Sequence, residues 1–324
     1  MKRIFFFLLA YCSCVAAQTG DSSTLRVDTS FTVYSAAAKV QKKFPSAKLV
    51  LPDLPRGVVA DENVVFDSSG SRALTLDVYY PESRSDSLYP GVILIHGGGW
   101  SSGDKSMEVP MAQQLAAHGY VAATVEYRLA PEAGFPAAVY DLKSAVRWMR
   151  ANSVKYHLDT TKIAAYGCSS GGELAAFLGA TGNVGKFEGS GSFLDRSSRV
   201  QAVVDVDGLL DFMNPNSTKY DTNSASPSAA DNWFGGSFRT IPEKWKEASP
   251  IEYVDGGTPP MIFINSSLPH YHAGQDETIL RLRNWGVYFE VHTIPDTPHP
   301  FWLFHPWFDQ TLQYTVTFLD KLFK

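Results

Sequence analysis

Residues 162–177 read KIAAYGCSSGGELAAF, a short apolar run followed by Gly-x-Ser-x-Gly and then by an alanine-rich segment. The pattern predicts a strand, a very sharp turn and a helix, because Gly167 and Gly171 lack a Cβ and let strand and helix approach closely. Such a turn strains the backbone of Ser169 and lifts its hydroxyl above the sheet. We therefore expect Ser169 to be a nucleophile; a glycine-rich helix start that only packs on a strand is the alternative.

Strand and helix patterns alternate on both sides of this turn. The β-branched run at 92–95 is typical of a strand buried on both faces, and alternating residues at 63–66 and 73–80 predict antiparallel strands. Further strands are expected at 120–127, 162–166, 200–206, 261–264 and 287–294, and helices at 34–43, 107–118, 137–151 and 308–323. This alternation predicts an α/β fold with a mostly parallel central sheet and helices on both faces.

The composition fits one large globular domain. The chain has 324 residues, of which 44% are hydrophobic and 19% charged. No repeat or linker divides it, so we expect a single domain over residues 18–324. Residues 208–250, rich in Asn, Ser, Pro and Gly, predict an irregular insertion in that domain.

Residues 1–17 have the features of a cleavable secretory signal. A basic start at residues 2–3 precedes a short apolar run, and small residues at 15–17 supply a cleavage site. The apolar run is too short to span a membrane, so a secreted or periplasmic protein is expected, with acylation of Cys12 or Cys14 as the alternative. Without this segment, the chain keeps 26 of its 28 basic residues and all 33 acidic residues. Nothing in this mildly acidic chain indicates nucleic-acid binding. Cys168 would then be the only cysteine, which excludes an intrachain disulfide.

A glycine loop directly follows the buried strand at 92–95. It reads HGGGW at 96–100, and consecutive glycines expose backbone N–H groups without side-chain obstruction. We expect the N–H groups of Gly98, Gly99 and Ser170 to form an oxyanion hole for a tetrahedral intermediate. A flexible turn is the alternative, and His96 is expected to have a structural role.

Five spaced motifs resemble the esterases related to hormone-sensitive lipase, and more narrowly the bacterial carboxylesterase and feruloyl-esterase-like branch. They are HGGGW at 96–100, GD at 103–104, YRLAPE at 127–132, FPAA at 135–138 with Asp141, and the serine turn. The resemblance covers about residues 60–324. It implies the α/β-hydrolase fold and hydrolysis of carboxylic esters, and bacterial relatives often remove acetyl, methyl or feruloyl groups from plant cell-wall glycans.

The general base is expected on a loop after the last strand, where residues 293–301 read TIPDTPHPF. The resemblance places the histidine of the family at His299. An imidazole titrates near neutral pH, so it can take the serine proton and return it to the leaving alcohol. His305 is the fallback, and loop packing of a histidine between two prolines is the non-catalytic interpretation.

The acid departs from the pattern of the family, which usually carries an Asp after the strand that corresponds to 261–264. Here residues 265–272 read NSSLPHYH and contain no carboxylate. Asp205 and Asp207 lie on one face of the preceding strand, and Asp207 is nearer the carboxyl end, where sites of parallel sheets form. We therefore expect Asp207 to orient His299. The alternatives are Asp276, Asp205 and Asp211.

Four further side chains are expected near the substrate. They are Trp100 after the glycine loop, Glu173 in the first helical turn behind the nucleophile, His270, and Trp302 in an aromatic tail. A helix-start acid is the alternative for Glu173, and a hydrophobic cap is the alternative for Trp302. No Asp or Glu stands beside His270 and His272 at metal-ligand spacing, so no metal or other cofactor is expected.

These residues together predict a secreted serine carboxylesterase that works through an acyl-enzyme on Ser169. Its expected substrates are small acyl esters or ester-decorated plant polysaccharides such as pectin or xylan. The alternatives are a lipase or peptidase on the same scaffold, and a non-catalytic glycan-binding relative that keeps the fold.

Overall fold

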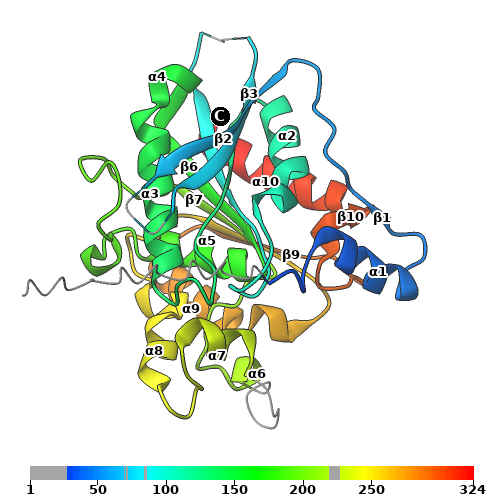
Figure 1. Ribbon diagram of the computed structural model, residues 1–324, viewed down its shortest axis with the longest axis vertical. Coiled ribbons are helices and arrows are strands. Elements are labelled where there is room, and N and C mark those ends of the chain that lie inside the picture. The colour runs from blue at the N-terminus through cyan, green and yellow to red at the C-terminus, as the bar shows by residue number, and fades with distance from the viewer. Residues whose placement is uncertain (1–27, 69, 71, 84–85, 219–226) are drawn as a thin grey trace, which may run out of the picture.

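The computed structural model describes residues 28–68, 70, 72–83, 86–218 and 227–324, and the expected signal segment lies outside these ranges (Figure 1). A central sheet contains β2 (Val58–Asp67), β3 (Leu74–Pro81), β4 (Tyr89–Ile95), β5 (Val121–Val125), β6 (Leu158–Cys168), β7 (Ala202–Val206), β8 (Met261–Asn265) and β9 (Phe289–Thr293). These eight strands lie in the order β2-β3-β5-β4-β6-β7-β8-β9. β3 is antiparallel to both β2 and β5, and all other neighbours are parallel.

Helices cover both faces of this sheet (Figure 1). They are α1 (Val33–Lys43), α2 (Val109–Ala117), α3 (Ala137–Ala151), α4 (Ser153–Tyr156), α5 (Ser170–Ala180), α9 (Gln275–Asn284) and α10 (Trp307–Phe323). Val92 and Leu94 of β4 pack in a cluster with α2 and α10, whereas Ile93 and Ile95 pack in a second cluster with α3 and α5. Successive residues of a strand point to opposite faces. All four side chains are fully buried because helices cover both faces. The predicted α/β fold with a mostly parallel sheet is confirmed.

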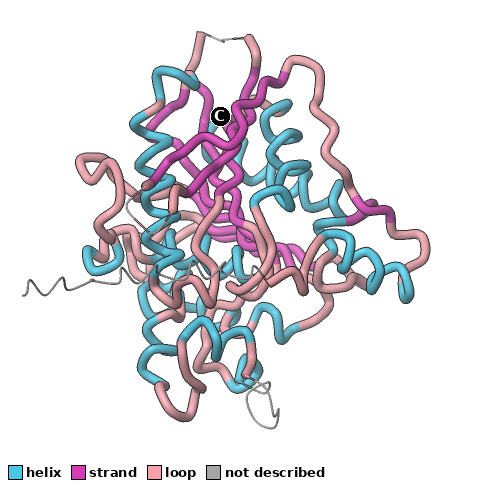
Figure 2. Tube along the Cα trace, viewed as in Figure 1, coloured by secondary structure: helices cyan, strands magenta, loops and turns pink. Residues whose placement is uncertain are grey.

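The segment between β7 and β8 is more regular than its composition predicts. It contains the short helices α6 (Pro215–Thr218), α7 (Ala229–Phe234) and α8 (Pro242–Glu247). Ser228 and Asp231 form a capping box at the start of α7, and Trp245 of α8 packs on Phe234 with ring centroids 4.7 Å apart. Helices and loops, not strands, make up this lower end of the view (Figure 2).

Long-range pairing also extends two strands beyond their expected bounds. β2 begins at Val58 rather than at residue 63 because its pairing with β3 continues to Val58 and Pro81. β6 begins at Leu158, which pairs with Tyr89 of β4. A small sheet of β1 (Lys48–Leu49) and β10 (Phe304–His305) joins the N-terminal segment to the start of α10. Among the described residues, no helix has the length and apolar character needed to cross a membrane.

Candidate active site

The carboxyl ends of β4 and β6 form the switch point of the sheet. The chain leaves β4 for β5 on one side and then returns to β6 on the other side of β4. Loops that follow two such strands turn away from each other and leave a crevice, which is where ligands bind in open α/β sheets. The glycine loop at 96–100 follows β4, and Ser169 follows β6.

Ser169 occupies the sharp turn between β6 and α5. Its backbone φ is 55° and ψ is −122°, a left-handed conformation that is strained for a residue with a side chain. A Cβ on Gly167 would lie 1.9 Å from the carbonyl oxygen of Gly171, and a Cβ on Gly171 would lie 2.1 Å from that of Ile95. Only glycine therefore fits at these two positions, and the predicted strand, turn and helix are confirmed.

Three side chains from distant parts of the chain form one line of hydrogen bonds. His299 Nε2 lies 2.7 Å from Ser169 Oγ, and His299 Nδ1 lies 2.8 Å from Asp207 Oδ2. Ser169 follows β6, Asp207 follows β7, and His299 lies on the loop after β9. These distances suit an imidazole that donates its Nδ1–H to the carboxylate and accepts the serine proton at Nε2.

Asp207 is buried, yet its surroundings favour the ionised form. Burial by itself raises the pKa of Asp207, but hydrogen bonds from His272, His299 and Ser266 and the charge of His299 outweigh it, so the pKa lies below its usual value. The Ser266 N–H donates to Asp207 Oδ1 over 2.9 Å. The backbone of Asp207 also has a positive φ of 53°. The carboxylate is therefore charged and held by several donors.

The other candidate acids have different partners. Asp205 is buried and accepts from the Gly208 N–H over 2.8 Å, and burial raises the pKa of Asp205 well above its usual value. Asp211 accepts from the Met213 N–H, and Asp276 is exposed in the first turn of α9. Among the described residues, Asp207 is the carboxylate that contacts His299.

A buried imidazole, that of His96, lies at the start of the glycine loop. His96 Nδ1 lies 2.8 Å from the Gly97 carbonyl oxygen, and the His96 ring stacks on Tyr127 with centroids 4.4 Å apart. Burial lowers the pKa of His96, which keeps the imidazole neutral and supports the expected structural role. The φ values of Gly98 and Gly99 are positive, 133° and 61°. In the described part of the chain, no protein acceptor binds the N–H groups of Gly98, Gly99 or Ser170.

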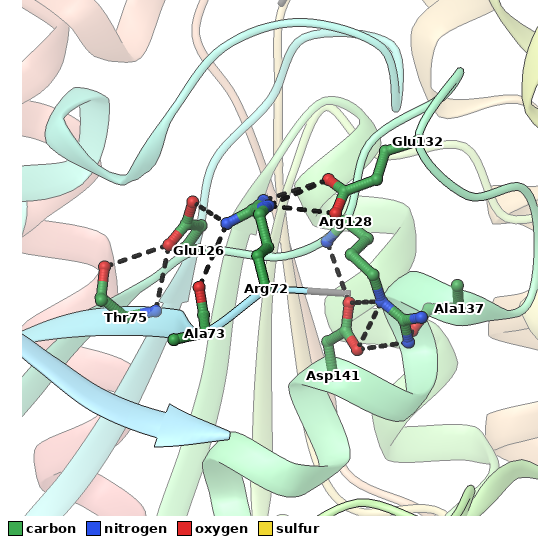
Figure 3. Close-up of polar contacts among 8 residues, drawn as sticks. All are labelled: Arg72, Ala73, Thr75, Glu126, Arg128, Glu132, Ala137 and Asp141. Carbon is green, nitrogen blue, oxygen red and sulfur yellow. Dashed lines mark hydrogen bonds and ion pairs between the residues drawn. The ribbon is translucent and has the colours of Figure 1, made fainter. Parts of the chain in front are cut away.

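An ion-pair network holds the loop at 126–132 to Arg72 and to α3 (Figure 3). Arg128 binds Asp141 of α3 with two guanidinium nitrogens, the shorter contact being 2.7 Å. Arg72 binds both Glu126 and Glu132, the latter at 3.0 Å. The N–H of the nearby residue Ala130 donates to the Trp100 carbonyl over 2.8 Å. The loop at 126–132, which Asp141 holds to α3, thus contacts the glycine loop through Ala130.

A cavity of about 390 Å³ opens beside Ser169. It is lined by the strand ends (Gly99, Trp100, Ser169, Ser170, Asp207, Leu209), by the segment between β7 and β8 (Phe212, Ser217, Ser228, Ala229, Ala230, Trp245) and by the loop after β8 (His270, Tyr271). Trp100 and His270, two of the four side chains expected near the substrate, line this cavity. Most of the wall is apolar, which suits an acyl or aryl group.

Glu173 and Trp302 do not line this cavity, contrary to our expectation. Glu173 has no exposed surface, and its Oε2 accepts from the Trp100 indole N–H over 2.9 Å. Burial raises the pKa of Glu173 well above its usual value, so it acts as a neutral support behind Trp100. Trp302 is 4% exposed and packs edge-to-face on His299, with ring centroids 5.2 Å apart. Helical and aromatic patterns alone do not tell which side of the site a residue supports.

The loop after β8 contributes residues that sequence reasoning left without a role. Tyr271 stacks on His299 with centroids 3.3 Å apart, and His272 Nδ1 lies 3.4 Å from Asp207 Oδ1. In the sequence, the feature that could have drawn attention to this polar loop was its lack of a carboxylate. His305, the fallback base, instead pairs with Asp309 at 2.8 Å.

Several known proteins with similar sequences are named as esterases. The mycobacterial esterase LipC (Mycobacterium tuberculosis) is 31% identical over 60% of this chain and 48% of its own length. The carboxylesterase NlhH of the same species is 35% identical over 39% of each chain. The matches thus span about half, or less, of these curated relatives.

Solved structures extend the comparison to most of this chain. A truncated carbohydrate esterase from gut microbiota superposes with a TM-score of 0.69, 25% identity and coverage of 84% of this chain and 99% of its own. A bifunctional GH43-CE protein of Bacteroides eggerthii gives a TM-score of 0.68 at 27% identity, over 82% of this chain and 38% of its own. The sequence profile of the BD-FAE family matches residues 76–270, which is more than half of the chain. The chain therefore belongs to the BD-FAE family and has the α/β-hydrolase fold of esterases.

Proposed function

We propose that this protein is a serine carboxylesterase in which Ser169, His299 and Asp207 form the catalytic triad. The observation that carries the proposal is the continuous pair of contacts, 2.7 Å from Ser169 Oγ to His299 Nε2 and 2.8 Å from His299 Nδ1 to Asp207 Oδ2. Ser169 lies at the wall of an apolar cavity, beside backbone N–H groups that have no protein acceptor in the described residues.

In the proposed reaction, Ser169 Oγ bonds to the ester carbonyl carbon while its proton passes to His299 Nε2. The charge of Asp207 stabilises the resulting imidazolium, and the N–H groups of Gly98, Gly99 and Ser170 bind the oxyanion. The bond to the alcohol then breaks, and the alcohol oxygen takes the proton from His299. Water attacks the acyl-enzyme in the same way, its proton passing through His299 to Ser169 as the carboxylic acid leaves.

Fluorophosphonate labelling tests the nucleophile directly. We expect the wild-type protein to take up one fluorophosphonate per chain and Ser169→Ala to take up none. Asp207→Asn should lower kcat by about 10⁴-fold, since the imidazole loses its orientation and its counter-charge. Asp276→Asn, which changes an exposed acid on α9, is the matched control and should keep the wild-type rate. Equal labelling of the wild type and Ser169→Ala would refute the proposed nucleophile.

We further propose that the substrates carry acetyl, methyl or feruloyl esters on plant cell-wall polysaccharides such as pectin or xylan. Two structural neighbours at 25% and 27% identity are named as a carbohydrate esterase and a GH43-CE protein, which supports this substrate class. The apolar cavity is compatible with an acyl group as large as feruloyl. Secretion would bring the enzyme to such polymers, and the pattern of residues 1–17 supports it.

Product release from defined polymers tests the substrate class. Acetate, methanol and ferulate are measured after incubation with acetylated xylan, methylated pectin and feruloylated xylan fragments. We expect release of at least one product, abolished in Ser169→Ala. Faster turnover of long-chain acylglycerols or peptides than of any glycan ester would instead identify a lipase or peptidase.

A further inference from the structure

The carboxylate of Asp207 has an imidazole on each of its two oxygens. His299 Nδ1 lies 2.8 Å from Oδ2, and His272 Nδ1 lies 3.4 Å from Oδ1. The Asp207 side chain has no exposed surface, while the side chains of His272 and His299 are 18% and 15% exposed. His299 faces Ser169 as the proposed base, so the contact of His272 with Asp207 needs a different explanation.

His272 belongs to a loop that the sheet holds firmly beside Asp207. The strands β7 and β8 are parallel neighbours, and the Asp207 N–H donates to the Ile264 carbonyl at the end of β8 over 3.0 Å. From this loop, the Ser266 N–H donates to Asp207 Oδ1 over 2.9 Å. Tyr271 of the same loop covers the ring of His299. One short segment therefore contacts both the acid and the base.

We propose that His272 is a positioning residue that holds Asp207 Oδ1 and thereby keeps Oδ2 directed at His299. This inference rests on the proposed function. A buried carboxylate is stable only when hydrogen-bond donors satisfy its oxygens, and the loss of one donor leaves its oxygen less well held. If His272 is removed, the Ser266 N–H alone holds Oδ1, so the orientation of the carboxylate towards His299 is less firmly fixed.

Two substitutions of His272 separate a positioning role from a merely structural one. His272→Leu removes the donor, whereas His272→Asn places an amide N–H close to the position of the imidazole Nδ1. With p-nitrophenyl acetate, we expect His272→Leu to lower kcat by about 10-fold and leave KM within about twofold, since a hydrogen bond to a charged group is lost. His272→Asn should recover most of the wild-type kcat.

A double-mutant cycle with Asp207 tests the path of the effect. Because His272 acts through Asp207, His272→Leu should change kcat by less than about twofold in an Asp207→Asn background. A full further 10-fold loss in that background, or a wild-type kcat in His272→Leu alone, would overturn the inference. If His272→Leu does not fold, His272→Ser, whose hydroxyl is too short to reach Oδ1, takes its place with the same expected outcomes.

Controls distinguish failure of this inference from failure of the proposed function. His292→Leu removes another partly buried histidine that contacts a carboxylate, at 3.1 Å from Glu290 on β9, and should keep the wild-type kcat. If Ser169→Ala retains fluorophosphonate labelling, the proposed function fails. If labelling depends on Ser169 but His272→Leu is fully active, only the positioning role is refuted.

Discussion

Glu108 is a buried acid beneath the nucleophile turn. Its Oε2 lies 3.9 Å from the sulfur of Cys168, and its Oε1 has no partner among the described residues. Burial raises the pKa of Glu108 to about 8, and the contact with Cys168 offsets this only in part. Burial also raises the pKa of the Cys168 thiol well above its usual value. Both groups are therefore mostly neutral at pH 7, and Cys168 is a packing residue rather than a rival nucleophile.

The proton on Glu108 predicts a pH-dependent stability. The folded-state pKa of about 8 exceeds the ordinary value of 4.5, so unfolding releases a proton between these pH values. The free energy of unfolding should therefore fall as pH rises from about 4.5 to 8. Glu108→Gln should reduce the difference in that free energy between pH 5 and pH 8 by about 3 kcal/mol, measured by urea denaturation. A wild-type pH slope in this variant would contradict the prediction, and the exposed Glu243→Gln serves as its control.

The turn between β6 and α5 requires the start of α5 to lie very close to the end of β4, so it constrains whole elements and not only one side chain. A Cβ on Gly171 would lie 2.1 Å from the Ile95 carbonyl oxygen at the end of β4 and 2.7 Å from that of His96. The helix start, the nucleophile strand and the glycine loop thus meet at backbone contact distance. The relative positions of Ser169 and the glycine loop depend on this contact.

Gly171→Ala should therefore harm both stability and catalysis. The new methyl group must push α5 away from β4, and overpacking of this kind costs about 1–3 kcal/mol. We expect a lower urea midpoint and a kcat reduced by at least about 10², because the oxyanion donors move relative to Ser169. Gly185→Ala is the matched control, since no atom lies within 4 Å of its added Cβ. Wild-type activity in Gly171→Ala would show that the contact is not needed.

At the scale of the whole molecule, the cavity lies between the sheet and the segment that joins β7 to β8. Trp100 of the glycine loop stacks on Trp233 of α7 with ring centroids 4.8 Å apart and nearly parallel planes. Phe212 and Trp245 from the same segment line the cavity together with Trp100, and Trp233 packs behind Trp100. The proposed catalytic residues lie on loops that directly follow strands of the sheet, whereas the shape of the cavity also depends on the helices between β7 and β8.

A larger side chain on α7 should therefore change selectivity more than chemistry. Ala229 lines the cavity, and Ala229→Phe would fill part of its volume of about 390 Å³. We expect kcat/KM for methyl ferulate to fall by about 10-fold more than kcat/KM for methyl acetate, because only the larger acyl group meets the new ring. Fluorophosphonate labelling of Ser169 should persist. Equal losses for both esters would show that Ala229 does not limit acyl size.

The sequence by itself determined the features that depend on neighbouring residues. Glycine spacing around Ser169 and after the strand at 92–95 predicted a sharp turn and an open loop, since both depend on backbone conformations that glycine allows. Periodicity predicted the mostly parallel sheet. The resemblance to the esterase family placed the candidate base at His299, on the loop after the last strand. Strand ends were less accurate, because pairing partners such as Tyr89 and Leu158 are distant in sequence.

Only the tertiary structure decided which side chains meet. The sequence favoured Asp207 over Asp205 only by its place nearer the end of the strand, whereas the fold shows that Asp205 contacts the Gly208 N–H and Asp207 contacts His299. Glu173 is buried behind Trp100 and therefore does not line the cavity. Contacts of this kind depend on which strand ends are neighbours in the sheet and on how deeply each charge is buried. Those are properties of the folded chain as a whole, so a local pattern can favour a residue for a role but does not show its contacts.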